Sequence, residues 1–538
     1  MESPPATKIK IIQAKEVPVQ TRRKRFTDIC TLPVRIVSEI VCVILLFTIL
    51  AGFLLSWPSV SNYVSEKIRA KIRLAPDSDG FQGWLKPPVE TIRTYRLYNI
   101  TNYMDIMTNK SDPLLEFQET KPLRYKLSVN KNNVEWLEKN EKLKYSLERL
   151  FTRAETFDEE LLNQEGAFID ILRVMIRTNF GLKPDQNFYT LTGLNAFNYS
   201  KAVDKLEGYV SPIFESVAEK MIGPNKDKYG FIYRYNGSNG FNYTILTGAK
   251  NSSIKGQMVD FASAYSKFTT SADQWNIDLF DGTTYPVMGD PPNRKVINIF
   301  QPDFCRPVQL RYVQTVSKFG FDRLHEYVLK FVDYETCPEM DETCTEADRV
   351  DITKCLSTDL PSGVVVVTKP HMYGHNSSAL NVAFTPDAEK HESAIYFEPT
   401  TGTPIRGRTR IQMNVNALID RIKYNKRGTI EPMGTRATTR FIPILWIDQS
   451  ITLNADVQSR LKSGIRIIGI INTGGDYHRM LKLVHILVFI FSLIGIIVMV
   501  ELFFWNRRRK RCEITLYQDN EPEKTPLNRS GTAPPSTA

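Results

Sequence analysis

The sequence predicts a membrane protein with two transmembrane helices and one large, mainly β domain between them. Three observations support this prediction: two long apolar segments near the ends, a basic cluster on the terminal side of each, and short β-rich runs in the middle. With 538 residues, 42% of them hydrophobic and 24% charged, the composition is that of a folded chain. It excludes a disordered, collagen-like or coiled-coil protein.

The two apolar segments are long enough to cross a bilayer. Residues 36–57 include 18 consecutive residues without a charge, and residues 483–505 are interrupted only by isolated polar residues. About 20 apolar residues in a helix span the ~30 Å hydrocarbon core, whereas buried helices of soluble proteins rarely run this long without a charge. The first segment begins too far into the chain for a cleaved signal peptide. We therefore expect a signal anchor at 36–57 and a second membrane helix at 483–505.

The formal charge of +10 lies mostly in the two tails. Residues 1–35 carry a net +5 and residues 506–538 a net +3, with basic clusters at 22–25 and 507–511. Because Lys and Arg accumulate on the cytosolic side of membrane helices, both tails are predicted to be cytosolic. Residues 58–482 then form an ectodomain with a net charge of only +4. Basic tails beside anionic lipid explain the total charge, so nucleic acid is not the expected partner.

Cysteines and glycosylation sequons agree with this topology. The predicted ectodomain contains Cys305, Cys337, Cys344 and Cys355, which predicts two disulfides with three possible connectivities. Seven N-x-Ser/Thr sequons there predict N-glycosylation: Asn99, Asn109, Asn198, Asn236, Asn242, Asn251 and Asn376. On the cytosolic side, Cys30 and Cys512 flank the spans and are candidates for palmitoylation.

Within the ectodomain, β-rich runs predominate and no linker divides the chain. Val364–Val367, Val296–Ile299 and Ile465–Ile471 are predicted strands. The turn residues 236–240 separate two further runs, 231–235 and 241–246, which predicts a hairpin.

A helical subdomain is predicted at residues 155–222. Apolar residues recur there at helical spacing: Phe168, Ile171, Leu172, Met175 and Ile176. Asp170, Arg173 and Arg177 are predicted to face solvent on the other side of that helix. A second helix is expected between Ser211 and Gly223.

The sequence contains no common catalytic motif. Nucleophile elbow, dinucleotide-binding, P-loop and H-E-x-x-H patterns are all missing from it. His371 and His375 have the spacing of two metal ligands on a helix. However, Pro370 precedes them and Gly374 lies between them, so no helix is expected there. We therefore expect no enzyme, no cofactor and no metal site.

Several motifs, in the right order, resemble the class B scavenger receptor family, which includes fatty acid translocase and the high-density-lipoprotein receptor. Pro370–Tyr373 resembles the family's P-H-F-Y, and Pro443–Trp446 resembles its P-I-L-W. Lys390–Ser393 followed by Glu398–Pro404 resembles H-x-T…P-x-T-G-x-P. There are departures: G-P-Y-x-Y reads K-P-L-R-Y at 121–125, and W-G-Y-x-D-P reads E-G-Y-V-S-P at 207–212.

The resemblance implies an antiparallel β-barrel ectodomain, a helical bundle at the membrane-distal apex (155–222) and a hydrophobic tunnel toward the bilayer. It also implies nested disulfides, Cys305–Cys355 and Cys337–Cys344. The implied partners are the membrane, lipids (fatty acids, sterols, phospholipids) and lipoprotein particles, with a homo-oligomer as a possible assembly. Candidate ligand-binding residues at the apex are Arg173, Arg177, Lys183, Phe168, Leu172 and Met175.

The function implied by the resemblance is capture of lipid or lipoprotein at the plasma membrane, followed by uptake or by transfer to the membrane. One alternative is a trafficking receptor for a luminal protein in the endosomal or lysosomal membrane, as one family member is. A second alternative is a two-span ligand-gated channel subunit. Such subunits share the hairpin topology, but their ectodomains carry many more cysteines than four.

Overall fold

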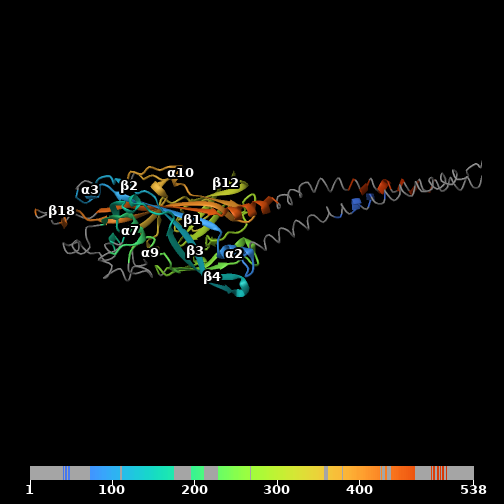
Figure 1. Cartoon of the computed structure of the whole chain (residues 1–538), viewed down its shortest axis with the longest axis horizontal. Coiled ribbons are helices and arrows are strands. Elements are labelled where there is room, and N and C mark those ends of the chain that lie inside the picture. Colours follow the sequence, from blue (N-terminus) through green and yellow to red (C-terminus); the bar gives the residue numbers. More distant parts are fainter. Residues whose placement is uncertain are drawn as a thin grey trace, which may run out of the picture. The chain divides into compact units, whose positions relative to one another are not determined.

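The computed structural model describes residues 73–466, except for 109–111, 172, 175–177, 179–195, 211–227, 267, 357–360, 378–379, 425, 427–429 and 433–437. It also describes single positions within 40–52 and 486–505. Two compact units are present: residues 65–467, and residues 1–64 together with 468–538 (Figure 1). Cys30 and Cys512 lie outside the described residues.

In the unit formed by residues 1–64 and 468–538, the described positions are helical, and most of them carry exposed apolar side chains. They include Val43, Leu46, Phe47, Ile486, Leu487, Phe489, Ile490, Leu493, Ile494, Ile497 and Val498. Among the residues that the structure describes, no helix is both long enough and apolar enough to span a membrane. Most of the predicted spans, 36–57 and 483–505, lies outside the described residues.

A 16-stranded, mainly antiparallel sheet forms the core of the unit 65–467, which confirms the predicted large β domain. Its main path runs β10 (Leu279–Phe280), β11 (Val296–Gln301), β12 (Arg306–Lys318), β13 (Phe321–Lys330), β16 (Ala394–Glu398), β17 (Thr403–Ile419), β20 (Thr438–Leu453), β1 (Val89–Ile100), β3 (Leu123–Leu137), β4 (Lys142–Arg153), β7 (Phe241–Leu246), β8 (Met258–Ser263) and β9 (Thr269–Ser271). This strand order begins with β10 and ends with β8 and β9. An isolated bridge between Gln257, next to β8, and Phe280 of β10 joins its two ends.

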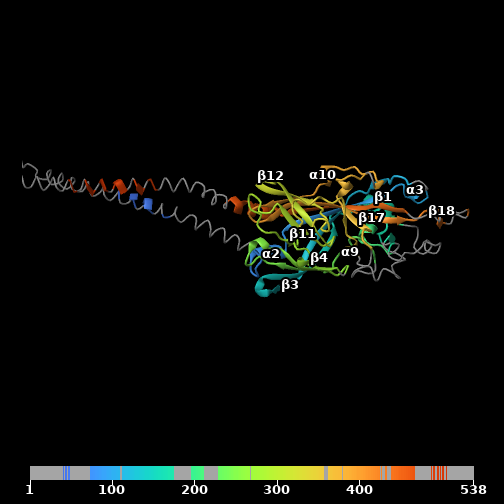
Figure 2. The ribbon, with the colours of Figure 1, turned by 180° about the vertical axis from the view of Figure 1, so that it is seen from behind.

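Three shorter strands complete this sheet: β2 (Phe117–Glu119), β14 (Val350–Asp351) and β15 (Val365–Thr368). Two separate two-stranded sheets are formed by β5 (Glu165–Ile169) with β6 (Phe197–Lys201), and by β18 (Ile422–Tyr424) with β19 (Ile430–Pro432). The helices are α2 (Asp79–Leu85), α3 (Tyr103–Thr108), α4 (Glu159–Leu162), α7 (Ala202–Glu207), α9 (Thr353–Leu356), α10 (Ala388–His391) and residues 455–466. Both views place α3 and β18 at one end of this unit and α2 at the other (Figures 1 and 2).

Two of the predicted strands are confirmed, and the predicted hairpin is wrong. Val296–Ile299 lies in β11, and Val365–Val367 in β15. Residues 241–246 form β7, which pairs with β4 and β8. Residues 231–235, however, form turns, because the amides of Phe231 and Ile232 donate to the carbonyls of Lys205 and Leu206 rather than to a strand.

The predicted strand at Ile465–Ile471 is contradicted at its start, where Ile465 and Arg466 are helical. Val457, Leu461 and Ile465 recur every four residues and pack on a small cluster made by Phe321, Leu324, Ile405 and Leu453. That tertiary contact decides between helix and strand for a β-branched sequence. The rest of the run lies outside the described residues.

The predicted subdomain at 155–222 is only partly described. Phe168 lies in β5 instead of a helix, and the described helical positions begin at Ile171. Asp170, predicted to face solvent, is 1% exposed because it accepts hydrogen bonds from Lys205 (3.3 Å) and Tyr209 (2.7 Å). The free-energy cost of burying this carboxylate is offset by its interactions with Lys205 and Tyr209. The helix predicted between Ser211 and Gly223 lies outside the described residues.

Candidate functional site: a cavity against the central strands

A cavity of about 100 Å³ lies against one face of the central strands β1, β17 and β20. The strands contribute Arg93, Tyr95, Thr409, Ile411, Met413, Ile447 and Gln449. The opposing walls contribute Ile171, Tyr229, Gly230, Phe231, Arg234, Tyr235, Gln301, Asp303, Phe304, Ile352 and Leu356. Most of this lining is apolar, and its charged side chains are Arg93, Arg234 and Asp303. Ligand pockets commonly combine an apolar wall with a few placed polar groups.

The register of β1, β17 and β20 places the lining residues of these three strands side by side. Gln449 of β20 lies opposite both Arg93 of β1 and Thr409 of β17. In the next row on the same face, Ile447 lies opposite Tyr95 and Ile411. Since alternate residues of a strand share a face, the intervening residues point to the other side of the sheet.

The facing wall is the turn segment 229–235, and its close approach requires glycine. A Cβ on Gly230 would lie 2.6 Å from the amide nitrogen of Gly208 and 2.7 Å from the carbonyl oxygen of Leu206. No side chain fits at such distances without moving the backbone of α7's end. Gly230 thus lets the aromatic residues on either side of it, Tyr229 and Phe231, lie against the cavity.

A disulfide joins the remaining two parts of the wall. Cys305 follows Phe304, Cys355 precedes Leu356, and the two sulfurs are bonded with a Cα–Cα distance of 5.2 Å. A second bond joins Cys337 and Cys344. The nested pairing implied by the family resemblance is therefore confirmed.

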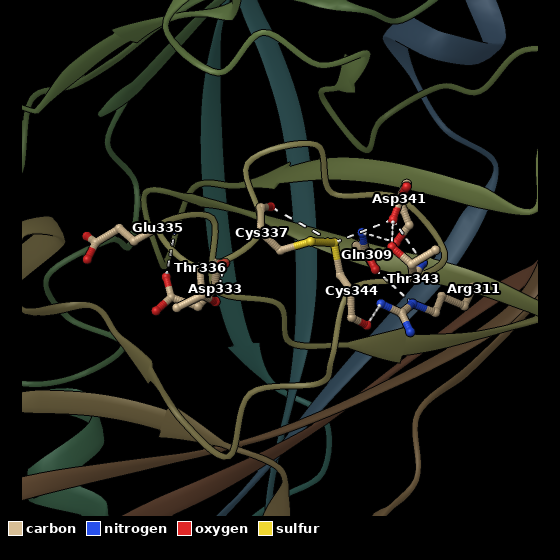
Figure 3. The surroundings of a disulfide bond; sticks show 9 residues. All are labelled: Gln309, Arg311, Asp333, Glu335, Thr336, Cys337, Asp341, Thr343 and Cys344. Carbon is tan, nitrogen blue, oxygen red and sulfur yellow. Dashed lines mark hydrogen bonds between the residues drawn. A yellow bond between two sulfur atoms is a disulfide. The ribbon is translucent and has the colours of Figure 1, made fainter.

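The inner disulfide stabilises an exposed loop away from the cavity lining (Figure 3). There the side chain of Arg311 donates to the carbonyl oxygen of Cys344 (2.5 Å), and Gln309 donates to that of Asp341 (3.2 Å). Cys337, Asp341 and Cys344 are close enough to hold a metal ion. Because both sulfurs are used in the disulfide, the group is not a metal site.

Two arginines share one carboxylate of the lining, Asp303. Arg149 pairs with Asp303 at 2.5 Å, and Arg93 lies 3.8 Å from the same carboxylate while donating to Gln449 at 2.8 Å. Burial acts to raise the pKa of Asp303, but Arg149 and Arg93 outweigh burial and hold that pKa below its usual value. Asp303 therefore stays ionised and is already shared by two guanidinium groups.

Arg234 is the third guanidinium of this region. Its side chain donates to the carbonyl oxygens of Tyr265 (3.0 Å) and Leu356 (3.2 Å). Within the described residues, its Nε atom is buried without a hydrogen-bond partner, and the side chain has no carboxylate partner. A buried donor left unpaired costs about 1–3 kcal/mol. A bound anion would accept a hydrogen bond from this Nε–H group of Arg234.

Three of the family-like motifs, which contribute His371, His391 and Trp446, meet on the opposite face of the same strands. The rings of His371 and His391 stack with centroids 4.5 Å apart, and His391 meets the edge of Trp446. His371 also bonds Glu119 at 2.5 Å. His371 and His375 do not share a metal-like arrangement, since His375 pairs with Asp348 instead. These three motifs thus build one packed cluster beside β20.

Of the predicted ligand-binding residues, the two that the structure describes, Phe168 and Arg173, do not lie in the cavity lining. Phe168 is 2% exposed in β5, and Arg173 lies 3.6 Å from the buried Asp170. Leu172, Met175, Arg177 and Lys183 lie outside the described residues. Sequence reasoning missed Arg93 and Arg234. The one available signal was the aromatic run at 229–235, in which Arg234 is the only charged residue.

The sequons differ in their surroundings. Asn236, Asn251 and Asn376 are exposed, Asn198 and Asn242 are half-buried, and Asn109 lies outside the described residues. Asn99 is half-buried, and its Oδ1 accepts a hydrogen bond from the amide of Ala167 at 2.9 Å. A Cβ on Gly166 would lie 2.6 Å from that side chain, so Asn99 is packed tightly against β5. Glycosylation of all seven stays a prediction.

Comparison with known proteins gives a consistent result. Residues 40–500 match the model of the CD36 family. The chain is 23% identical over 432 residues to lysosome membrane protein 2 of Rattus norvegicus, covering 75% of this chain and 83% of that protein. It is 23% identical over 461 residues to sensory neuron membrane protein 1 of Apis mellifera, covering 78% and 84%. A 28% identical match to sensory neuron membrane protein 2 of Aedes aegypti covers 43% and 44%.

Proposed function

Because the chain belongs to the CD36 family, we propose that it binds lipid or lipoprotein ligands and mediates their uptake or their transfer to the membrane. Membership confirms the resemblance to class B scavenger receptors, and the chain is a scavenger-receptor-like membrane protein and not an enzyme. The cavity beside β1, β17 and β20 is the proposed site. The observation that carries the proposal is its apolar lining with an unpaired arginine donor at one side.

The size and chemistry of the cavity favour the polar end of a single-chain lipid. A volume of about 100 Å³ holds roughly seven or more water-sized groups. That is room for a carboxylate and its first methylenes, each of which gains about 0.8 kcal/mol on leaving water. The rest of the chain would continue through a tunnel inside a closed barrel. The Gln257–Phe280 bridge supports such closure.

Arg234 is the proposed partner of the lipid carboxylate. Hydrogen bonds to an ionised group contribute about 1.5–3 kcal/mol, and guanidinium binds carboxylates in a planar, two-pronged geometry. Arg93 is less suited to bind the lipid carboxylate, because its guanidinium already donates to Gln449 and lies beside Asp303. The uncharged remainder of the lining discriminates little between lipid tails, so the headgroup carries the specificity.

The substitution Arg234→Gln tests this site. We expect the affinity of the full chain for oleate to fall at least about tenfold, while its affinity for the matching alcohol, which has no charge, stays within about threefold. Arg124→Gln is the matched control, because Arg124 is half-exposed on β3 and pairs with Glu155. Binding is measured by titration in detergent. Equal oleate affinity in the Arg234 variant and the parent would contradict the proposal.

We propose a hairpin topology with both tails cytosolic and residence at the plasma membrane. The predicted spans and the basic clusters beside them support this. The similarity to a protein named for the lysosome membrane supports the lysosomal membrane as the second location, where the chain would act as a trafficking receptor for a luminal protein. Surface labelling of intact cells distinguishes the two locations.

A further inference from the structure

We propose that the outer face of the strands β3, β1, β20 and β17 is a docking surface for a sulfated polysaccharide of the cell surface. This is the face of the sheet opposite the lipid cavity. We call it the arginine face and define it by its six basic residues: Arg96, Arg124, Lys126, Arg406, Arg408 and Arg410. The inference rests on the proposed topology, which puts this domain outside the cell, and not on lipid binding.

Strand register assembles the arginine face. Arg406, Arg408 and Arg410 occupy every second position of β17, so they lie on one side of the sheet in a row with a spacing of about 6.6 Å. Register through β20 and β1 places Arg408 in line with Lys126 of β3. It likewise places Arg410 in line with Arg124. The cations thus border a strip that is three strand spacings, or about 14 Å, wide.

Four of these cations are open to solvent. Arg406 and Lys126 are exposed on β17 and β3. The side chains of Arg408 and Arg124 are 55% and 49% exposed. An extended ligand that lies across the four strands can therefore reach cations on both sides of the strip.

Few carboxylates offset this charge. In the three rows that run through the arginines of β17, the four strands carry only Glu90 and Asp448. Asp448 is buried and accepts hydrogen bonds from Arg408 at 2.6 and 2.9 Å. From outside these strands, Glu155 lies 3.3 Å from Arg124. Because a guanidinium has five N–H donors, both arginines keep donors for a further anion.

The other exposed cations have no carboxylate partner. Within the described residues, Lys126 and Arg406 form no ion pair. The guanidinium of Arg96 lies 4.5 Å from the ring centroid of Trp446, and its Nη1 is buried without a hydrogen-bond partner in the part of the chain that the structure describes. The concentration of charge is local, since residues 74–454 contain 45 Lys and Arg against 47 Asp and Glu. The arginine face is thus a positive patch on a nearly neutral domain.

The chemistry of this face favours a sulfated polymer. One exposed ion pair contributes at most about 1 kcal/mol, so a ligand has to engage several cations at once. Sulfates on successive sugars of one chain do this, and the planar guanidinium suits an anion with several oxygens.

A folded acidic protein suits the face less well. Protein interfaces depend on apolar or aromatic anchors that fill pockets. Between the cations, the described strands present the small polar residues Thr94, Ser450 and Thr452, with Ile92 as the one apolar side chain in these rows. The charge is complementary to an acidic protein, but the anchors are missing from this part of the described chain.

The test uses the full chain in nanodiscs of phosphatidylcholine and a short heparin oligosaccharide as the probe. The variant R124Q/K126Q/R406Q removes three exposed cations and leaves Arg408 with the buried Asp448. The matched control K139Q/K250Q/K354Q removes three exposed lysines that lie elsewhere on the domain. Oleate titration and denaturant unfolding show whether each variant keeps the fold and the cavity. Polyglutamate of equal charge replaces heparin as a protein-like probe.

We expect the affinity of R124Q/K126Q/R406Q for the heparin oligosaccharide to fall at least about tenfold. The slope of log affinity against log salt should become shallower by about two, because each lost contact removes about 0.7–0.9. The control variant should keep the parent's affinity and slope, and oleate affinity should be unchanged in both variants. The inference would be overturned by unchanged heparin affinity in the first variant, by an equal loss in the control, or by tighter binding of polyglutamate than of heparin.

Discussion

Replacing Cys305 and Cys355 together by alanine will lower the free energy of unfolding by about 4 kcal/mol and weaken oleate binding at the same time. The bond closes a loop of 50 residues, and the chain entropy released in the unfolded state grows with loop length. Binding weakens because the neighbours Phe304 and Leu356 line the cavity and lose their mutual anchor. Denaturant unfolding of the full chain, followed by fluorescence, measures the first effect, and oleate titration measures the second.

The inner disulfide provides the matched control. Cys337 and Cys344 are only seven residues apart, so their replacement by alanine should cost about 2.5 kcal/mol. Neither residue lines the cavity, and oleate affinity should be unchanged. The account would be contradicted if the two double variants lost oleate affinity equally, because the outer bond would then have no special role in the cavity wall.

Acidification will destabilise the domain through His391. Burial, reinforced by the charge of neighbouring His371, lowers the pKa of His391 from 6.5 to about 4. Between these two values the unfolded chain takes up a proton that the folded chain does not, so stability falls as the pH is lowered from about 6.5 to about 4. The loss contributed by this one group amounts to up to about 3 kcal/mol.

The geometry explains why the folded state keeps this histidine neutral. Nδ1 of His391 accepts a hydrogen bond from the amide of Asp387 at 3.0 Å, which a protonated nitrogen could not do. In the variant His391→Gln, the loss of unfolding free energy on acidification should be smaller by up to about 3 kcal/mol. His375→Gln, on the loop after the same motif, should retain it. An unchanged pH dependence in the His391 variant would show that other groups control acid stability.

Local sequence patterns predicted some of the strands and were wrong for others. Val365–Val367 became β15, because a β-branched run fits a fully buried strand. The aromatic run 231–235 also has high β-propensity, yet Gly230 and the carbonyls of α7 draw it into a turn beside the cavity. Ile465 likewise follows a four-residue apolar pattern that only its contact with Phe321 and Leu453 reveals as helical. Tertiary contacts decided both cases.

The cavity was beyond sequence reasoning because its parts are far apart in the chain. Arg93, Asp303 and Gln449 meet only through strand register and a loop held by a disulfide. No local motif marks any of them. The nested disulfide pairing, by contrast, followed from the family resemblance, since counting cysteines left three connectivities open. The histidine and tryptophan of the family-like motifs also lay together, although nothing in their spacing indicated a stacked pair.

Photolabelling of the full chain with a fatty acid that carries a photoreactive group near its carboxylate tests directly whether the cavity binds the lipid. Mass spectrometry of the digested protein identifies the labelled residues. The account predicts label on the segments 229–235, 301–304 and 409–413, which face one another across the cavity, and loss of that label when unlabelled oleate is added. Label confined to other segments, or label that oleate does not displace, would contradict it.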